Sequence, residues 1–339
     1  MNICIIGGSG FIGGHLINLL WEYHDLVNID KVKRTTRNNV SFVECDITDY
    51  PELKKSIPLE TDLVILLAAE HKDDVTPASK YYDVNVEGTE NVLKVMTEKH
   101  VHSIIFTSSV AVYGLNKHTP NEFSPTDPFN HYGKSKLEAE NVLRRWFDND
   151  QNGKSLIIIR PTVVFGPGNR GNVYNLLSQI SSGRFLIIGN GNNRKSMAYV
   201  ENVARFIAHC IDSNLQKFHL FNYIDKPDLS TKELVLQAEL AIGSKVLPVK
   251  IPYWIGYSIA KFFDIVLSLF NKKNPISAVR VKKFCATTQF DSATIQATGF
   301  VAPYTLQKGL EITIKSIVGE KYHSSHLKLK PSFANVDAD

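Results

Sequence analysis

The sequence lacks the features of a secreted, metal-binding or membrane-spanning protein. Only four cysteines occur in 339 residues, and they form neither a CxxC pair nor a Cys/His cluster with metal-ligand spacing. Isolated thiols of this kind are typical of a reducing compartment, so we expect a cytoplasmic protein without a metal site. No uncharged apolar run reaches the length of about 20 residues that a spanning helix needs. The first residues lack the basic region and the cleavage site of a secretory signal. We interpret them as a strand.

Excess charge and internal repeats are also absent. The formal net charge is only +4, and the basic residues form no continuous tract, which argues against a nucleic-acid partner. The 43% hydrophobic content is enough to fill a sizeable core.

Short apolar runs alternate with amphipathic segments of helix length through the first half of the chain. The runs cover residues 3–6, 62–67, 103–106 and 156–159. This alternation predicts an α/β protein with a Rossmann-type, doubly wound parallel sheet. We assign residues 1–165 to this domain, with a return near 200–225. Residues 166–199 and 226–318 form a smaller, interleaved α/β lobe for substrate binding, and residues 319–339 a flexible tail.

Glycines at positions 7, 10 and 13 separate the first strand from a helix that begins at about Phe11. This GxxGxxG spacing allows a tight turn and leaves the unpaired N–H groups of the helix free to bind a pyrophosphate. Asp30 ends the second predicted strand, where a carboxylate accepts hydrogen bonds from the adenosine ribose and favours NAD over NADP. Lys31, Lys33 and Arg34 nearby weaken that preference. Further dinucleotide contacts are expected from Phe11, Ile12, Asp46, Ile47, Leu67, Ala68 and Ala69. Asp46 taken alone fits a polar strand end nearly as well.

Tyr132 and Lys136 stand four residues apart, which places them on one face of a helix, one turn from each other. A neighbouring ammonium lowers the pKa of a tyrosine and makes it a better base. The spacing alone also fits a surface pair. However, the apolar run 104–106 is followed by the hydroxyl residues Thr107, Ser108 and Ser109. They would lie at the carboxyl end of a strand, where open α/β sheets bind ligands. Ser109 is then the third member of a catalytic set.

Several strings together resemble the extended short-chain dehydrogenase/reductase family, also called the NAD-dependent epimerase/dehydratase family, over about residues 1–315. They are GGSGFIG, NVEGTENVL, TSSVAVYG, YGKSK and RPTVVFGPGNRGN. Longer strings, among them LLAAEHKDDV, DPFNHYGKSK and VRVKKFCATTQFD, are similar to bacterial 4-epimerases that act on N-acetylglucosamine linked to undecaprenyl diphosphate.

This resemblance implies an isomerase that retains NAD and works through a 4-keto intermediate. The product would be lipid-linked N-acetylgalactosamine for surface polysaccharide (O-antigen) assembly. Ser109, Tyr132 and Lys136 match the family's catalytic positions, with Tyr132 taking the proton of the sugar 4-hydroxyl while hydride leaves for NAD. Relatives pair the helices around residues 79–99 and 132–146 across a homodimer.

Alternatives differ in the substrate or in the fate of the keto sugar. Dehydratases of this family carry an Asp-Glu pair after the catalytic hydroxyl residue, and Val110 and Ala111 stand there instead. A UDP-N-acetylglucosamine or UDP-glucose 4-epimerase would present the same sugar and diphosphate. A 4-ketosugar reductase using NAD or NADP would keep the triad, whereas a non-catalytic NAD-binding protein would be expected to lose part of it.

Residues outside the triad bear on the substrate. Leu66 and Val163 replace a histidine and an asparagine that the family often carries, and both positions are expected to face substrate or nicotinamide. His71 could reach the pocket in compensation, although a surface position is the more common outcome. Candidates for the substrate diphosphate are Asn169, Arg170, Arg194, Lys195 and Arg280, each of which could equally be a solvated charge.

Residues 251–270 form the most apolar segment outside the sheet. Its polar residues, Ser258, Lys261, Asp264 and Ser268, recur every three or four positions and leave a narrow polar stripe on a helix. Lys272, Lys273, Arg280, Lys282 and Lys283 follow. An apolar helix with adjacent cations suits docking on the inner face of an anionic membrane. A core helix or a dimer contact is an equally good interpretation.

Overall fold

The computed structural model describes residues 1–34, 40–72, 75–115, 117–183, 185–245, 249–268 and 278–327. For residues 268, 279, 280, 283 and 321–327 the description covers the backbone alone. Two compact units divide the chain. Unit 1 comprises residues 1–164, 193–229 and 286–306, and unit 2 comprises 165–192, 230–285 and the remainder from 307.

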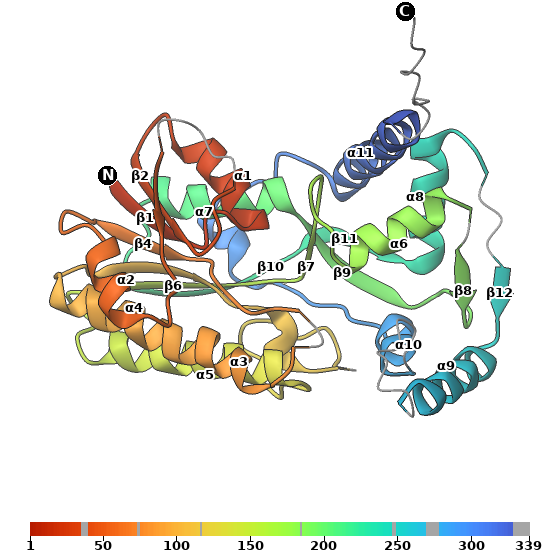
Figure 1. Cartoon of the computed structure of the whole chain (residues 1–339), viewed down its shortest axis with the longest axis horizontal. Coiled ribbons are helices and arrows are strands. Elements are labelled where there is room, and N and C mark those ends of the chain that lie inside the picture. Colours follow the sequence, from red (N-terminus) through yellow and green to blue (C-terminus); the bar gives the residue numbers. More distant parts are fainter. Residues whose placement is uncertain are drawn as a thin grey trace, which may run out of the picture. The chain divides into compact units, whose positions relative to one another are not determined.

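A seven-stranded parallel sheet forms the centre of unit 1 (Figure 1). Its strand order is β10-β6-β5-β4-β1-β2-β3. The strands are β1 Asn2–Ile6, β2 Asp25–Asp30, β3 Ser41–Glu44, β4 Leu63–Leu66, β5 Ser103–Thr107, β6 Ser155–Pro161 and β10 Phe218–Tyr223. The chain adds β2 and β3 on one side of β1, and it then returns to place β4 on the other side. The carboxyl ends of β1 and β4 therefore flank the switch point at which such sheets bind ligands.

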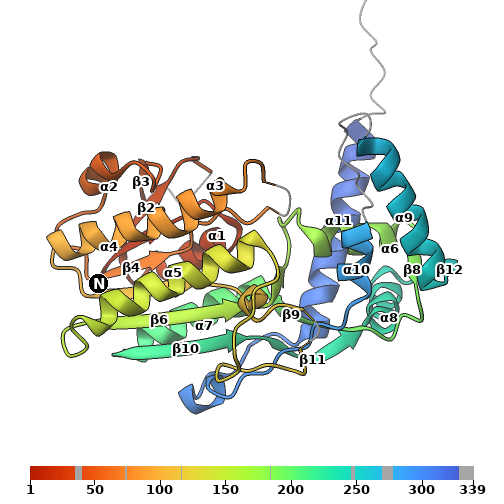
Figure 2. The ribbon, with the colours of Figure 1, turned by 90° about the horizontal axis from the view of Figure 1, so that it is seen from below.

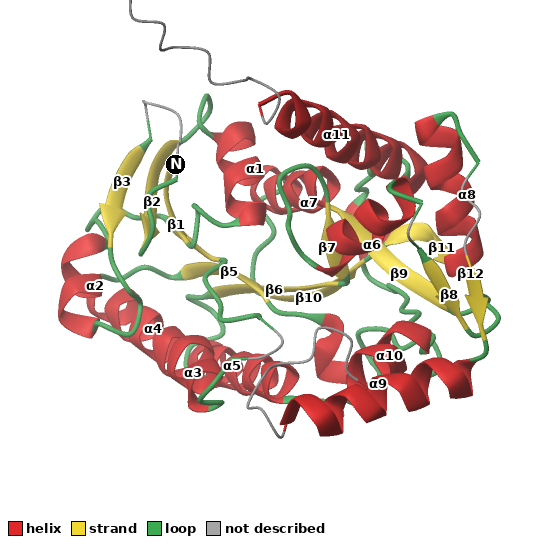
Figure 3. Cartoon of the chain, turned by 45° about the vertical axis from the view of Figure 1, so that its right-hand side comes forward, coloured by secondary structure: helices red, strands yellow, loops and turns green. Residues whose placement is uncertain are grey.

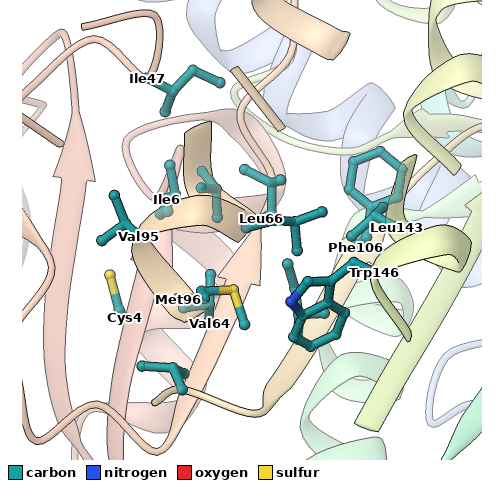
Figure 4. Close-up of a cluster of buried hydrophobic side chains, with 14 of the residues drawn as sticks. Cys4, Ile6, Ile47, Val64, Leu66, Val95, Met96, Phe106, Leu143 and Trp146 are labelled. Atoms are coloured by element: carbon teal, nitrogen blue, oxygen red, sulfur yellow. The ribbon is translucent and has the colours of Figure 1, made fainter. Parts of the chain in front are cut away.

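Helices cover both faces of this sheet (Figure 2). On one face, Ile3 and Ile5 pack with Leu16 of α1 (Phe11–Leu20) and Phe206 of α7 (Val200–Asp212). On the other face, Cys4 and Ile6 pack with α2 (Tyr50–Ser56), α4 (Gly88–Glu98) and α5 (His131–Asp148). Figure 4 shows this second cluster. Successive residues of β1 thus point to opposite, equally buried faces, which explains the continuous apolar runs of the sequence.

The remaining elements are short strands and peripheral helices (Figure 3). β11 (Asp225–Ser230), β9 (Arg194–Tyr199) and β7 (Val163–Phe165) form a three-stranded sheet, in that order. β12 (Val249–Ile251) pairs in parallel with β8 (Leu186–Ile188) in unit 2. The helices of unit 2 are α6 Asn172–Ser181, α8 Thr231–Ile242, α9 Tyr253–Ser268, α10 Ala278–Cys285 and α11 Leu306–Leu327.

The predicted boundaries differ from the observed ones in several segments. Residues 193–199 and 226–229, assigned from the sequence to the substrate lobe, belong to unit 1. Residues 286–306, assigned from the sequence to the substrate lobe, pack in unit 1, where Phe290 N donates to Ser196 Oγ of β9 over 2.9 Å. Residues 319–327, expected to begin a flexible tail, continue helix α11, and residues 328–339 lie outside the described residues. None of the helices in the described ranges is both long and apolar enough to cross a bilayer. The assignment of the two units to cofactor and substrate binding stays a prediction.

Candidate active site

The glycine loop after β1 lies against the chain that leaves β4. Gly7 has a φ of +87°, and a Cβ built there would lie 2.4 Å from the backbone nitrogen of Ala68. A Cβ at Gly13 would lie 2.5 Å from Cα of Gly8, so helix α1 packs directly on the loop. Any side chain at either position would push these segments apart. The loop therefore needs both glycines, as the sequence motif predicts.

The amino end of α1 offers uncapped N–H groups. Gly10 is the residue that caps this helix, and it has no side chain to accept their hydrogen bonds. A helix start of this kind, facing the carboxyl edge of a parallel sheet, suits a pyrophosphate.

The carboxylate of Asp30 is held at the same edge. It accepts hydrogen bonds from Ser9 N at 3.1 Å and Val32 N at 3.2 Å, and the side chain is half-buried. Asn28 supports the loop in turn by donating to Ser9 Oγ over 3.1 Å. The carboxylate is thus fixed beside the glycine loop, where an adenosine ribose would lie. The loop, the helix start and Asp30 together fit a dinucleotide.

The other predicted cofactor contacts occupy neighbouring strand ends. Asp46 Oδ1 accepts hydrogen bonds from Thr48 N and Thr48 Oγ1, and Ile47 is buried against Gly88 of α4. Leu67 N and Ala68 N both donate to Ile6 O, at 2.8 and 3.0 Å. Asp46 therefore stabilises its own turn. The dinucleotide contacts of Phe11, Ile12, Asp46, Ile47, Leu67, Ala68 and Ala69 stay predictions.

Tyr132 and Lys136 both lie on α5, as the spacing predicts. Asn130 caps this helix by accepting a hydrogen bond from Gly133 N at 2.9 Å. A Cβ at Gly133 would lie 2.6 Å from Ala111 O, so the first turn of α5 presses on the segment that follows Ser109. Local packing thus brings the elements that carry Ser109 and Tyr132 together.

Lys136 is fully buried, with 1% of its surface exposed. Its Nζ lies 4.0 Å from the centre of the Phe106 ring. Burial lowers the pKa of Lys136 to about 7, and the negative charge of Glu140 acts in the opposite direction. The ammonium is thus held in place by a buried environment that also brings its titration close to neutral pH.

Ser109 follows β5 in extended backbone and begins the 3₁₀ turn Val110–Tyr113. Its half-buried Oγ accepts a hydrogen bond from Ala111 N at 3.1 Å. Val110 and Ala111 carry no proton-transferring group at the positions where a dehydratase needs its acids.

Two interactions at this site were missed from the sequence, and the first is a buried ion pair. Glu140, one helical turn beyond Lys136, accepts hydrogen bonds from Arg160 Nε at 2.8 Å, from a terminal nitrogen of Arg160 at 2.5 Å and from Ser108 Oγ at 2.5 Å. Arg160 also donates to Tyr113 Oη over 2.7 Å. The signal was a glutamate in phase with Lys136 on the buried face of the helix.

The second is Asn85, in the π-helical turn Asp83–Glu87. Its Oδ1 accepts from Glu70 N at 2.9 Å, and its Nδ2 donates to Glu70 O at 3.0 Å and to Ser135 Oγ at 2.9 Å. Asn85 thus ties the segment after β4 to the helix that carries Tyr132. π-helical turns often occur at functional sites. The turn itself, rather than a sequence pattern, is therefore the feature that points to Asn85.

The five diphosphate candidates are divided between the two units. Arg170 pairs with Glu320 at 3.0 Å in unit 2, and Asn169 Oδ1 accepts from Gly171 N. Arg194 and Lys195, in unit 1, donate to the backbone oxygens of Asp228 and Ala286 at 2.7 and 2.6 Å. The side chain of Arg280 lies outside the described residues. Their role toward a diphosphate stays a prediction.

Leu66 and Val163, which replace a histidine and an asparagine of the family, were both expected to face substrate or nicotinamide, and for Leu66 this expectation is wrong. Leu66 does not face substrate or nicotinamide, because its side chain is completely buried in the core between β4 and the helices α4 and α5 (Figure 4). Val163 is 41% exposed at the start of β7, and His71 is exposed.

Comparison with known proteins identifies the family. The model of the NAD dependent epimerase/dehydratase family matches residues 3–222. The chain belongs to this family. Membership confirms the predicted family, the Rossmann-type fold and NAD as the cofactor.

Individual relatives cover nearly the whole chain. N-acetyl-alpha-D-glucosaminyl-diphospho-ditrans,octacis-undecaprenol 4-epimerase of Escherichia coli O157:H7 is 49% identical over 314 residues, which cover 93% of this chain and 94% of that protein. UDP-glucose 4-epimerase of Vibrio cholerae is 28% identical, covering 94% and 95%. The structure of UDP-glucuronic acid 4-epimerase from Bacillus cereus in complex with NAD matches with a TM-score of 0.73, 19% identity and coverage of 94% and 99%.

Proposed function

We propose that the protein is an NAD-dependent 4-epimerase that interconverts N-acetylglucosamine and N-acetylgalactosamine on undecaprenyl diphosphate, for O-antigen or related surface polysaccharide assembly. The observation that carries the proposal is the 49% identity to the Escherichia coli enzyme over 93% of the chain. Ser109, Tyr132 and Lys136 support it, because Tyr132 and Lys136 lie one turn apart on α5, and Gly133 of the same helix packs on the segment that follows Ser109.

Gly7, Gly10, Gly13 and Asp30 would hold the pyrophosphate and ribose of NAD, and Lys136 the nicotinamide ribose. When bound, NAD supplies the acceptor and donor of a hydride at carbon 4 of the sugar. The Tyr132 hydroxyl, as phenolate, takes the proton of the sugar 4-hydroxyl and later returns it. The Lys136 ammonium favours that phenolate, and Ser109 Oγ hydrogen-bonds the oxygen of the keto sugar. Turning of the keto sugar between the two transfers inverts the centre.

The structure of the Ser109 turn favours epimerisation over dehydration. Loss of water from a 4-keto sugar requires an acid and a base beside the ring, and Val110 and Ala111 provide neither.

The donor assignment is tested by supplying purified protein with undecaprenyl-diphosphate-linked N-acetylglucosamine in one reaction and UDP-N-acetylglucosamine in another. The sugar is then released by mild acid and analysed. We expect N-acetylgalactosamine from the lipid-linked donor. Conversion of only the UDP-linked sugar would overturn this assignment and favour a UDP-N-acetylglucosamine 4-epimerase.

We further propose a cytoplasmic homodimer that meets its substrate at the inner face of the cell membrane. The dimer would form through the helices around residues 79–99 and 132–146. Light scattering of the purified protein tests this, and a monomeric mass would contradict it.

A further inference from the structure

Helix α9 of unit 2 carries large apolar side chains that are exposed to solvent. The exposed fractions are 68% for Trp254, 62% for Phe262 and 57% for Ile265. Ile259 and Phe263 flank them and are about half exposed, at 49% and 48%. Single exposed apolar residues are common on proteins, but a contiguous set on one helix marks an interaction surface.

The opposite side of α9 is already packed inside unit 2. A Cβ at Gly256 would lie 2.8 Å from Ile188 Cγ2 of β8, and Ala260 is buried with Ala278 and Val281 of α10. Asp264 Oδ2 accepts a hydrogen bond from Ala278 N at 2.8 Å. Helix α9 therefore makes its contacts with the core of unit 2 through this side.

The three most exposed of these apolar side chains share one side of the helix, which we call the outer side. At about 100° per residue, Trp254, Ile265 and Phe262 lie within about 80° of one another, opposite Ala260. Among the exposed residues of α9, the polar ones on this outer side are Ser258 and Lys261. We call Trp254, Phe262 and Ile265 the α9 outer face.

The surrounding sequence is strongly basic. Residues 245–285 contain eight Lys or Arg and one Asp, a formal charge of +7. The whole chain has only +4, so the rest of it is at −3. Lys250 of β12, Lys261 of α9 and Lys282 of α10 are exposed. All of the excess positive charge thus lies in the segment that carries the α9 outer face.

We propose that the α9 outer face, with Lys261 on the same side of the helix, docks on the anionic surface of a lipid bilayer. Apolar side chains would enter the interfacial region while Lys261 contacts lipid headgroups. This partner rests on the proposed function, since a polyprenyl diphosphate substrate is presented at such a surface. A symmetric contact between two copies would bring the +7 segments together, and that repulsion disfavours a dimer here.

The test is sedimentation of the full-length protein with vesicles of phosphatidylcholine alone or mixed with phosphatidylglycerol. We expect binding to the mixed vesicles, weakened by salt. The triple variant Trp254→Ser, Phe262→Ser, Ile265→Ser should lose it. Lys261→Gln should bind about fivefold more weakly, because one lysine near the surface contributes about that factor.

Matched controls change equally exposed residues elsewhere. Leu59→Ser, Phe123→Ser, Val301→Ser removes three apolar side chains of 71%, 79% and 82% exposure, and Lys94→Gln removes one exposed charge. Both controls should bind like the wild type. Circular dichroism checks that every variant is folded.

Trp254 also reports on insertion directly. Its fluorescence should shift to the blue with anionic vesicles, and Trp254→Phe should lose that shift while still sedimenting. Absence of wild-type binding, equal loss in the control variants, or a variant-sensitive dimer in light scattering without vesicle binding would each overturn the proposal. Vesicle binding without turnover of the lipid-linked sugar would support docking and overturn the donor assignment instead.

Discussion

Glu140 offers the sharpest single test of the interactions beneath the catalytic helix. The side chains of Glu140 and Arg160 are 0% and 3% exposed, and two hydrogen bonds join them. Glu140→Gln removes the negative charge and keeps the shape of the side chain. Because the Arg160 charge would then stay buried without compensation, we expect the free energy of unfolding to fall by about 3–5 kcal/mol.

The local geometry explains why glutamine cannot replace the carboxylate. Both oxygens of Glu140 accept hydrogen bonds from Arg160, and one of them also accepts from Ser108 Oγ. A glutamine presents one oxygen and one NH₂ group, so an Arg160 donor would face another donor. The variant loses charge and hydrogen bonds at once.

The assay is urea denaturation of the wild type and the variant at one fixed, saturating concentration of NAD. Glu98→Gln, which breaks the exposed ion pair of Glu98 with Lys54, is the matched control and should leave stability unchanged. The double variant Glu140→Leu, Arg160→Met removes both charges and should recover most of the loss. A change of less than about 1 kcal/mol in Glu140→Gln would refute a buried charged pair.

The pH dependence of Glu140→Gln tests whether Glu140 also acts on the catalytic Lys136, beyond stabilising the fold. The Glu140 charge raises the pKa of Lys136, which burial lowers to about 7. Without that charge the pKa of Lys136 falls further, so its ammonium is lost at a lower pH. We expect the alkaline limb of the pH–rate profile to move to lower pH. An unmoved limb would limit Glu140 to stabilising the fold.

Three further predictions address the site. Tyr132→Phe should reduce epimerisation by roughly 10²- to 10⁴-fold, measured by sugar analysis, while NAD binding followed by fluorescence persists. Gly7→Ala should weaken NAD binding, because its φ of +87° and the contact with Ala68 exclude a Cβ, whereas Gly14→Ala, with nothing near its Cβ, should not. The pKa of Lys136 is about 7 when folded against 10.5 as its ordinary value, so the unfolded chain binds more protons between those values. Stability contributed by this group therefore rises with pH in that window, by up to about 1.4 kcal/mol per pH unit, and denaturation of Lys136→Met should lack that component.

The cofactor loop and the Tyr132–Lys136 pair were predictable because each depends on short-range geometry. A spacing of three positions between glycines, and of four positions between a tyrosine and a lysine, determines which groups can share a turn or a helical face. The contact of Gly7 with Ala68 was not predictable in this way. It depends on β1 and β4 being neighbours in the sheet, and sequence spacing does not give strand order.

The orientation of Leu66 was misjudged for a related reason. All four residues of β4 are buried, so the strand shows no apolar and polar alternation from which its two faces could be read. Glu140 and Arg160 are a different case. A charged residue on a buried helix face requires a partner, but the sequence does not identify which residue that partner is. The partner lies 20 residues away on β6, where only the folded sheet brings it into reach. A buried charge in a sequence is therefore evidence that a specific tertiary contact exists, and the variants of Glu140 test that inference as directly as they test the enzyme.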